Sequence, residues 1–157
     1  MDELLYMQLA LKEASIAYQK GEVPIGAIVV NQSGEVIAGA HNQVEELNDP
    51  TAHAEILAIR KAAYKIKNWR LQECTIFCTV EPCVMCAGCI IQARIKKLVY
   101  ASEDNKFGAV KSLYNILEDQ RLNHYVEVDA GLFKDKSVNL LKSFFSEVRN
   151  KKKAKRL

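Results

Sequence analysis

The chain has 157 residues, of which 49% are hydrophobic and 26% are charged, so it is long enough for one globular domain with its own core. Its start lacks the basic and apolar regions of a signal peptide, and no run of about 18 apolar residues occurs, which argues against an exported or membrane-spanning protein and for a cytoplasmic one. The net charge of +3 is uneven, because residues 149–157 carry six of the 22 Lys and Arg and no acid, which leaves 16 basic against 19 acidic residues elsewhere. Such a basic tail either only solubilises a protein or contacts a polyanion, usually RNA or DNA.

Apolar periodicity and turn residues predict alternating helices and strands. The predicted elements in chain order are a helix over 2–20, strands over 23–31 and 36–42, a polar loop over 43–49, a helix after Pro50 with Thr51 as its N-cap, a strand over 74–80, a helix from Pro82, a strand over 97–102, a short helix over 112–121, a strand over 125–130 and a helix over 134–149. Helices that separate most of the strands favour an α/β fold in which helices cover both faces of one sheet. We expect a single domain over residues 1–149, followed by a basic C-terminal tail over 150–157.

The cysteines are unusually concentrated. Five of them lie within sixteen residues, at positions Cys74, Cys78, Cys83, Cys86 and Cys89. Because the number is odd and no export signal is present, metal binding or thiol reactivity is more probable than a disulfide framework. Cys74 and Cys78 fit one strand face as small core residues, and Cys89 is either a spare ligand or, as we prefer, a packing residue.

Two short motifs each open a predicted helix directly after extended chain. One is His53-Ala54-Glu55, and the other begins at Pro82 and contains Cys83 and Cys86 three residues apart. If the two helices start side by side, one imidazole nitrogen and two sulfurs converge, and this ligand set suits Zn²⁺. Three protein ligands leave a fourth position for water, which is typical of catalytic rather than structural zinc. Glu55 is then free to move a proton of that water.

Each motif alone is weak evidence. A lone H-x-E means little, and a lone C-x-x-C also occurs in redox proteins and structural zinc sites. Together, H-x-E followed by P-C-x-x-C is typical of zinc nucleobase deaminases.

The wider sequence resembles the bacterial tRNA-specific adenosine deaminases. The segments that carry the resemblance are DPTAHAE, TVEPCVMCAG and IIQARI, with GEVPIGAIVV before them and the late Phe-Phe helix after them. The resemblance implies a three-layer α/β/α cytidine deaminase-like domain with a central mixed five-stranded sheet, a homodimer and one zinc per subunit. It also implies hydrolysis of the wobble adenosine of a tRNA anticodon to inosine, with a zinc-bound hydroxide attacking C6 and Glu55 as the proton shuttle.

The same resemblance assigns roles to individual residues. It implies that His53, Cys83 and Cys86 bind the metal. The residues it implies for substrate binding are Val23, Asn42, Asp104, Lys106, Phe144, Phe145 and Arg149. Some of these also have plain structural explanations, since Asn42 fits the end of a strand and at least one of the two adjacent Phe residues is expected in the core.

The chain also departs from the family pattern. Where relatives have a Gly-rich run after Asp104, this chain has Phe107 and Lys111, and Cys89 stands where relatives mostly have Ala. The alternatives to a tRNA deaminase are a deaminase of free guanine or cytosine, a non-catalytic zinc module that binds RNA, and a thiol redox protein. The basic tail favours RNA over a free base, and Glu55 favours catalysis over a purely structural metal.

Overall fold

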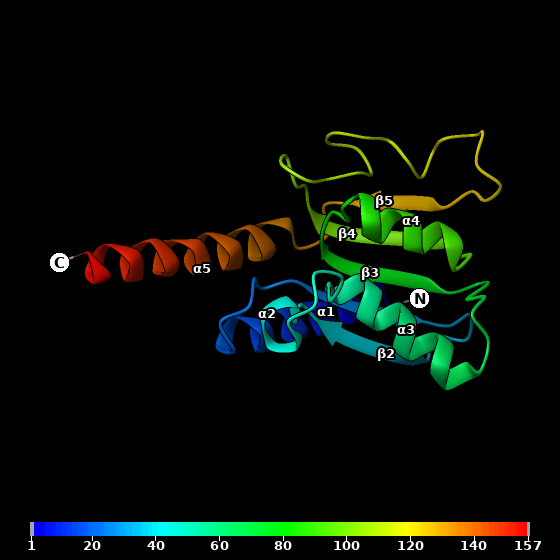
Figure 1. Ribbon diagram of the computed structural model, residues 1–157. Coiled ribbons are helices and arrows are strands. Elements are labelled where there is room, and N and C mark those ends of the chain that lie inside the picture. The colour runs from blue at the N-terminus through cyan, green and yellow to red at the C-terminus, as the bar shows by residue number, and fades with distance from the viewer. Residues whose placement is uncertain (1, 157) are drawn as a thin grey trace.

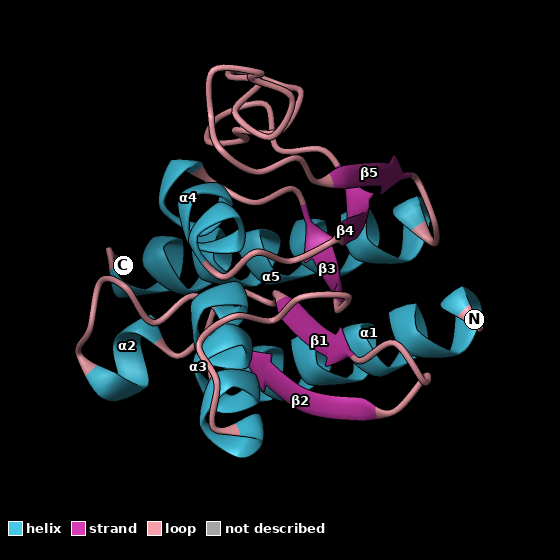
Figure 2. Cartoon of the chain, turned by 90° about the vertical axis from the view of Figure 1, so that its right-hand side faces the viewer, coloured by secondary structure: helices cyan, strands magenta, loops and turns pink. Residues whose placement is uncertain are grey.

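A mixed five-stranded sheet forms the centre of the molecule, in the strand order β2-β1-β3-β4-β5. The computed structural model describes residues 2–156, and its elements in chain order are α1 (Glu3–Gln19), β1 (Gly26–Val30), β2 (Val36–His41), α2 (Val44–Leu47), α3 (Ala54–Ile66), β3 (Thr75–Val80), α4 (Val84–Gln92), β4 (Lys97–Ser102), β5 (Glu127–Ala130) and α5 (Lys134–Lys155). β1 is antiparallel to β2 and β3, whereas β3, β4 and β5 run parallel (Figure 2). The predicted α/β fold with one five-stranded mixed sheet is confirmed.

Helices cover both faces of this sheet (Figure 1). On one face α1 packs against β1, with Met7 and Ala10 in a cluster that includes Ile28 and Val30. On the other face α3 and α4 pack against the alternate strand residues, among them Val29. Because successive strand side chains point to opposite faces, an almost fully apolar strand such as β1 can serve both cores. The three-layer arrangement follows from these two clusters.

Segment 112–121 forms turns rather than a helix, so the prediction of a short helix there was wrong. Its backbone N–H groups reach back to carbonyls that lie outside a helical ladder, as in the bond from Ile116 to Ala109. Leu113 and Tyr114 are exposed, so the apolar spacing that suggested an amphipathic helix buries little surface beyond Leu117. The expected loop over 43–49 was also too simple, since it contains the short helix α2.

Two helix boundaries differ from the prediction, namely the start of α3 and the end of α5. Helix α3 begins at Ala54 with His53 as its N-cap, because the Thr51 hydroxyl donates to Asp49 at 2.8 Å and is not available to cap the helix. Helix α5 continues to Lys155, so most of the predicted basic tail is helical. No helix within residues 2–156 is long and apolar enough to cross a membrane.

Close contact between α1 and β1 depends on small residues. A Cβ atom at Gly26 would lie 2.0 Å from the Ala10 carbonyl oxygen and 2.7 Å from the Ala14 nitrogen, both backbone atoms of α1. Ala10 and Ala14 are fully buried in this contact. The Gly26 N–H donates to the Thr79 hydroxyl at 3.1 Å, which ties the start of β1 to β3.

We expect Gly26→Ala to lower the free energy of unfolding by about 3 kcal/mol or more, at the upper end of overpacking costs, because backbone atoms must move to admit the methyl group. Gly88→Ala in α4 is the control, since a Cβ there meets nothing within 4 Å and should raise stability by up to about 1 kcal/mol. Urea unfolding of both variants measures the difference. Equal midpoints for Gly26→Ala and the wild type would contradict this account of the contact.

Candidate metal and active site

The N-termini of α3 and α4 lie side by side near the C-terminal end of β3. Their N-cap residues are His53 and Cys83. Both N-caps have extended backbone dihedrals, with φ of −76° in each case, and neither side chain makes a capping hydrogen bond. Their side chains are therefore free to point away from the helices toward a shared position. Cys86, in the first turn of α4, points to the same place, since its sulfur lies 3.5 Å from His53 Nδ1.

The three potential ligand atoms have the spacing that a tetrahedral metal site requires. His53 Nδ1 lies 3.6 Å from Cys83 Sγ and 3.5 Å from Cys86 Sγ, and the ligand atoms of all three residues lie within 4.8 Å of one another. With Zn–S near 2.3 Å and Zn–N near 2.0–2.1 Å, the N···S edge of a tetrahedron is about 3.6 Å. The residues present therefore fit a zinc ion in both chemistry and spacing.

The protons of these three side chains are strongly coupled. Hydrogen bonds from Cys86 and then His53 lower the pKa of the Cys83 thiol to about 4 despite its partial burial. The hydrogen bond with Cys83, together with burial, raises the pKa of Cys86, and the hydrogen bond with Cys83 raises the pKa of His53. The cluster thus stabilises a thiolate at Cys83, which is the form that binds a metal.

Glu55 lies beside this cluster without belonging to it. The residue is only 4% exposed, its carboxyl group is close to the Cys86 thiol, and burial raises its pKa. It is not part of the group whose ligand atoms converge. A buried carboxyl with a raised pKa beside a metal site has the properties of a group that accepts and returns a proton.

The loop that follows β4 is fixed against the site by Glu81, a residue to which the sequence analysis gave no role. Its buried carboxylate accepts backbone N–H groups from Asp104, Val110, Lys111 and Ser112 at 2.8–3.1 Å, and also the Ser112 hydroxyl. Burial alone would raise the pKa of Glu81, but these hydrogen bonds outweigh it and lower the pKa below its usual value. The only signal in the sequence is an acid placed directly before Pro82, at the end of a buried strand.

Gly108 brings this loop into contact with Cys83 of the candidate metal site. It forms an isolated antiparallel bridge with Cys83, and a Cβ atom at this position would lie within 2.5 Å of both the Glu81 carboxylate and the Asp104 carbonyl oxygen. The Asp104 carboxylate accepts the N–H groups of Lys106 and Phe107 at 3.0 and 3.2 Å. The loop is therefore a tightly hydrogen-bonded turn even though it lacks the Gly-rich family pattern.

Asn42 lies just after β2, and its amide is only partly used. Its Nδ2 donates to the Val23 carbonyl at 3.4 Å, whereas its Oδ1 is buried and has no hydrogen-bond partner among the described residues. A buried acceptor without a partner needs an explanation, and a bound ligand is one. Val23 itself is half-buried and precedes β1.

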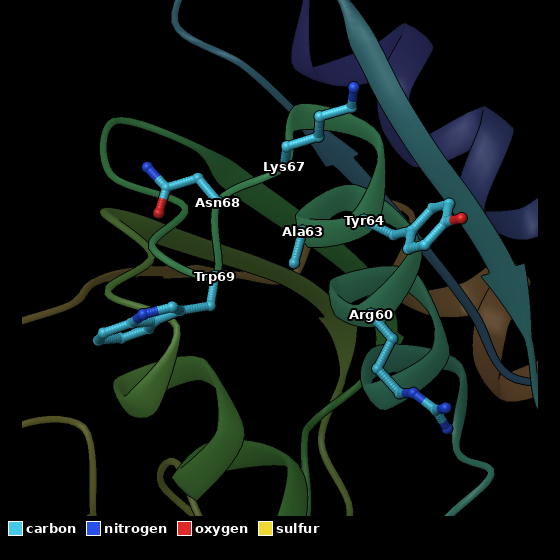
Figure 3. Close-up of a pocket in the computed structure, with 6 residues that line it drawn as sticks. All are labelled: Arg60, Ala63, Tyr64, Lys67, Asn68 and Trp69. Atoms are coloured by element: carbon cyan, nitrogen blue, oxygen red, sulfur yellow. The ribbon is translucent and has the colours of Figure 1, made fainter.

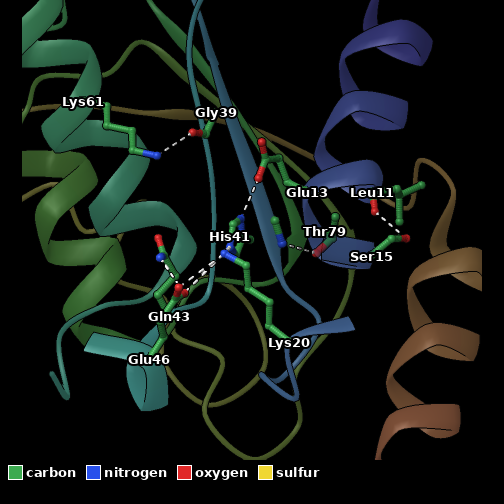
Figure 4. Close-up of polar contacts among 11 residues, drawn as sticks. Leu11, Glu13, Ser15, Lys20, Gly39, His41, Gln43, Glu46, Lys61 and Thr79 are labelled. Carbon is green, nitrogen blue, oxygen red and sulfur yellow. Dashed lines mark hydrogen bonds and ion pairs between the residues drawn. The ribbon is translucent and has the colours of Figure 1, made fainter. Parts of the chain in front are cut away.

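Polar contacts of His41, the residue before Asn42, with Glu13 and Lys20 hold the end of β2 (Figure 4). His41 Nδ1 lies 2.8 Å from the Glu13 carboxylate of α1, and its Nε2 lies 3.3 Å from Lys20 Nζ. The buried Glu22 carboxylate accepts the first N–H groups of α2, from Glu45 and Glu46, at 3.0 and 2.7 Å. The end of β2 is thus held from both sides.

The residues predicted on α5 lie differently from one another. Phe144 is buried at the edge of the Tyr18 ring, with a centroid separation of 5.7 Å, so it packs α5 against α1. Phe145 is 43% exposed, and Arg149 and Lys106 are exposed. The expectation that at least one of the two Phe residues is in the core is confirmed, while contacts with RNA stay predictions.

The other three cysteines lie outside the ligand cluster. Cys74 and Cys78 belong to the core on the α3 side of the sheet, and the half-buried Cys89 packs against it. The interpretation of all three as packing residues is confirmed.

An open hollow of about 680 Å³ lies at the C-terminal end of α3 (Figure 3). It is lined by Arg60, Ala63, Tyr64, Lys67, Asn68 and Trp69. Because its lining on α3 begins at Arg60, seven residues after His53, this hollow begins about 10 Å along the helix from His53. It is therefore separate from the candidate metal site.

Comparison with known proteins agrees with this geometry. The family described as MafB19-like deaminase matches residues 1–149. A tRNA-specific adenosine deaminase of Streptococcus pyogenes serotype M1 is 47% identical over 152 residues, which are 97% of this chain and 88% of the relative.

Two solved structures are also similar. One comes from studies of A-to-I editing by tRNA:A34 deaminases, with a TM-score of 0.84, 43% identity and coverage of 87% of this chain and 99% of the other. A guanine deaminase from Nitrosomonas europaea has a TM-score of 0.81 and 26% identity, with 90% and 84% coverage. The chain therefore belongs to the MafB19-like deaminase family and, within it, to the tRNA-specific adenosine deaminases.

Proposed function

We propose that this protein hydrolyses the wobble adenosine of a tRNA anticodon to inosine. The observation that carries the proposal is the triangle of His53, Cys83 and Cys86 with Glu55 buried beside it, on a chain 47% identical to a tRNA-specific adenosine deaminase. The chain covers most of that relative, so the whole reaction can reside in this one domain. The experiment that tests it is the incubation of the protein with an anticodon stem-loop and the detection of inosine.

His53, Cys83 and Cys86 would hold the catalytic ion, which we propose to be Zn²⁺ because of the mixed nitrogen and sulfur ligands. When bound, zinc lowers the pKa of a water molecule toward about 7 and so supplies a nucleophile at neutral pH. The ordinary pKa of a Glu carboxyl is too low for efficient proton exchange near pH 7, and burial shifts that of Glu55 in the useful direction. We propose that Glu55 takes one proton from the water and transfers it to adenine N1, and then moves the remaining proton of the attacking oxygen to the C6 amino group, which leaves as ammonia.

Substrate recognition would use the groups around this centre. The target base must leave its stack to enter the pocket, and an anticodon loop already presents unstacked bases, which lowers the cost. The unpartnered Oδ1 of Asn42 would accept a hydrogen bond from the nucleotide. Val23 would contact the base, and the remaining predicted contacts with the RNA strand are Asp104, Lys106, Phe144, Phe145 and Arg149. Phe144 would act mainly by packing α5, since it is buried.

The homodimer implied by the resemblance stays a proposal. The hollow at the end of α3 is a candidate for a contact between copies, because Tyr64 and Trp69 are 87% and 54% exposed there and aromatic side chains are enriched in interfaces.

Guanine deamination is the main competing function, since a guanine deaminase has a nearly equal TM-score. Its sequence identity of 26% is well below the 43% shared with the structure from the tRNA:A34 deaminase studies. Ammonia release from free guanine without inosine formation in RNA would favour this alternative.

Replacing Glu55 should separate metal binding from turnover. We expect Glu55→Gln and Glu55→Ala to lower the single-turnover rate on an anticodon stem-loop by about 10²–10⁴-fold, the usual contribution of a general acid–base group. Zinc content, measured by inductively coupled plasma mass spectrometry, should stay at the wild-type level. Retention of the wild-type rate in either variant would exclude Glu55 as the proton carrier.

Replacing Cys83, a proposed zinc ligand, should remove the metal, whereas replacing Glu55 should leave it in place. We expect about one zinc per chain in the wild type and a large loss of zinc in Cys83→Ser, because a serine hydroxyl is a poor zinc ligand at neutral pH. Cys89→Ser is the matched control in the same helix, since Cys89 packs against the core and its variant should keep the metal. A full zinc site in Cys83→Ser would show that Cys83 is not a ligand.

The cationic end of α5 should contribute to RNA affinity through phosphate contacts. Among residues 2–156, none of the ion pairs involves the Lys and Arg side chains beyond position 148. We expect the double variant Lys151→Gln, Lys152→Gln to weaken binding and to reduce the slope of log affinity against log salt by up to about 1.4, or 0.7 per phosphate contact.

The control for this experiment neutralises Lys65 and Lys96, which pair with Glu35 and Glu73 on the surface. Fluorescence anisotropy at several salt concentrations measures both slopes. If the α5 variant and the control change the slope equally, the α5 charges do not contact the RNA.

A further inference from the structure

Phe107 is an exposed aromatic side chain held next to the metal site, in the loop where this chain departs from its family pattern. It is 68% exposed, which is unusual for a residue type that normally buries its ring. Its neighbour Gly108 forms the bridge to Cys83. Because adjacent Cα atoms are 3.8 Å apart and bridged Cα atoms about 5 Å apart, the Phe107 backbone lies within roughly 10 Å of a metal ligand.

The position of Phe107 is fixed by hydrogen bonds on both sides. Its own N–H donates to the Asp104 carboxylate at 3.2 Å, and the Gly108 N–H donates to the Asp104 carbonyl at 2.8 Å. Glu81 then holds the next turn of the loop through Val110 and Lys111. The ring is therefore presented to solvent on a rigid support, so that little conformational entropy would be lost when a ligand covers it.

The charges around the ring suit a nucleic acid strand. Lys106 and Lys111 are exposed, and among the described residues neither takes part in an ion pair. Asp104 is already engaged with backbone N–H groups, which leaves the exposed Glu103 as the one uncommitted acid of the segment 103–111. A flat apolar ring between two lysines is the combination with which proteins hold single-stranded bases.

We propose that Phe107 stacks on a nucleobase that flanks the target adenosine in the anticodon loop, and that it helps to determine which loops are accepted. This inference rests on the proposed tRNA function. A distance of roughly 10 Å corresponds to about three stacked nucleotides, which are about 3.4 Å apart, so the base in contact lies within about three positions of the target. Since every base has an aromatic face, the contact selects for an unstacked neighbour rather than for one base type.

The test combines protein and RNA changes in a double-mutant cycle. Phe107→Ala should lower kcat/KM on an anticodon stem-loop by about 5- to 150-fold, the effect of losing one base–aromatic stack, whereas Phe107→Trp should stay within about threefold of the wild type. An abasic nucleotide at one flanking position should lower the wild-type value similarly and have little further effect on Phe107→Ala, because both changes remove the same contact. Fully additive losses at every flanking position would overturn the proposal.

Tyr125→Ala is the matched control, because Tyr125 is also 68% exposed but lies before the N-terminal end of β5, whereas Cys83 follows the C-terminal end of the parallel strand β3. In a six-residue strand such as β3, the two ends are about 17 Å apart. This control should leave kcat/KM unchanged. An equal loss in Tyr125→Ala and Phe107→Ala would indicate a general effect of exposed aromatics and would overturn a specific stack.

Two further measurements keep other roles of Phe107 apart from stacking. The fluorescence of 2-aminopurine at the flanking position should be quenched on binding to Glu55→Ala, whose turnover is slow, and not on binding to the double variant that also carries Phe107→Ala. The melting temperature of Phe107→Ala should stay within about 2 °C of the wild type, and its molecular mass in solution should be unchanged; a lost dimer would make Phe107 a subunit contact and overturn the proposal. If the wild type itself forms no inosine, the proposed function fails; if the wild type and Phe107→Ala are equally active, only this inference fails.

Discussion

The spacing of three side chains at two helix starts is the constraint on which the site depends. His53 and Cys83 are both N-caps, so their positions are set by where α3 and α4 begin rather than by flexible loops. The chain must therefore align two helices on one face of the sheet to within a fraction of an ångström. Packed helices are 8–10 Å apart, which is about two strand spacings, so a regular sheet under both helices provides the required separation. The 3.5–3.6 Å N···S distances are thus a consequence of the fold as a whole.

Two buried carboxylates fix the position of the parts of the site that lack regular structure. Glu22 holds the start of α2, next to Asn42, and Glu81 holds the loop next to Cys83. Burying a carboxylate is costly unless its oxygens accept several hydrogen bonds, and here the donors are backbone N–H groups of segments more than twenty residues away. Each carboxylate thereby replaces the missing sheet or helix contacts of a loop. The surroundings of the candidate metal site are consequently ordered before any substrate binds.

Local patterns were sufficient to predict the cluster of His53, Cys83 and Cys86 and most of the elements, because both depend on residues close together in the sequence. The motif around His53 and the one around Cys83 each open a helix, and the long apolar strands differ clearly from the amphipathic helices. Predictions failed where a distant residue decides the local structure. Segment 112–121 has helical spacing, but its start is held by Glu81 and its N–H groups bond to Gly108 and Ala109 instead.

The sequence also could not show which of two adjacent, chemically similar residues is buried. Phe144 and Phe145 are equally apolar, and only the position of α1 makes one of them a core residue beside Tyr18. In the same way, Glu81 reads as one more acid in the sequence, and its function becomes evident only when the loop from Asp104 to Ser112 folds around it.

Helix α5 is fixed to the sheet near the candidate metal site through Ser137, and it carries its basic residues at the far end, away from that site. The Ser137 hydroxyl donates to the Thr79 carbonyl at 2.6 Å and lies 2.8 Å from the Ser102 hydroxyl, at the strand ends that lead into Glu81 and the loop after β4. From this buried contact α5 extends outward past the sheet (Figure 1). At a rise of 1.5 Å per residue, Arg149 lies about 18 Å beyond Ser137 and the last basic residues nearly 30 Å beyond it. Under the proposed function, charges at that distance would act on the RNA backbone and hence on association, whereas the proton transfers would depend on Glu55, so the two functions could vary independently in this chain.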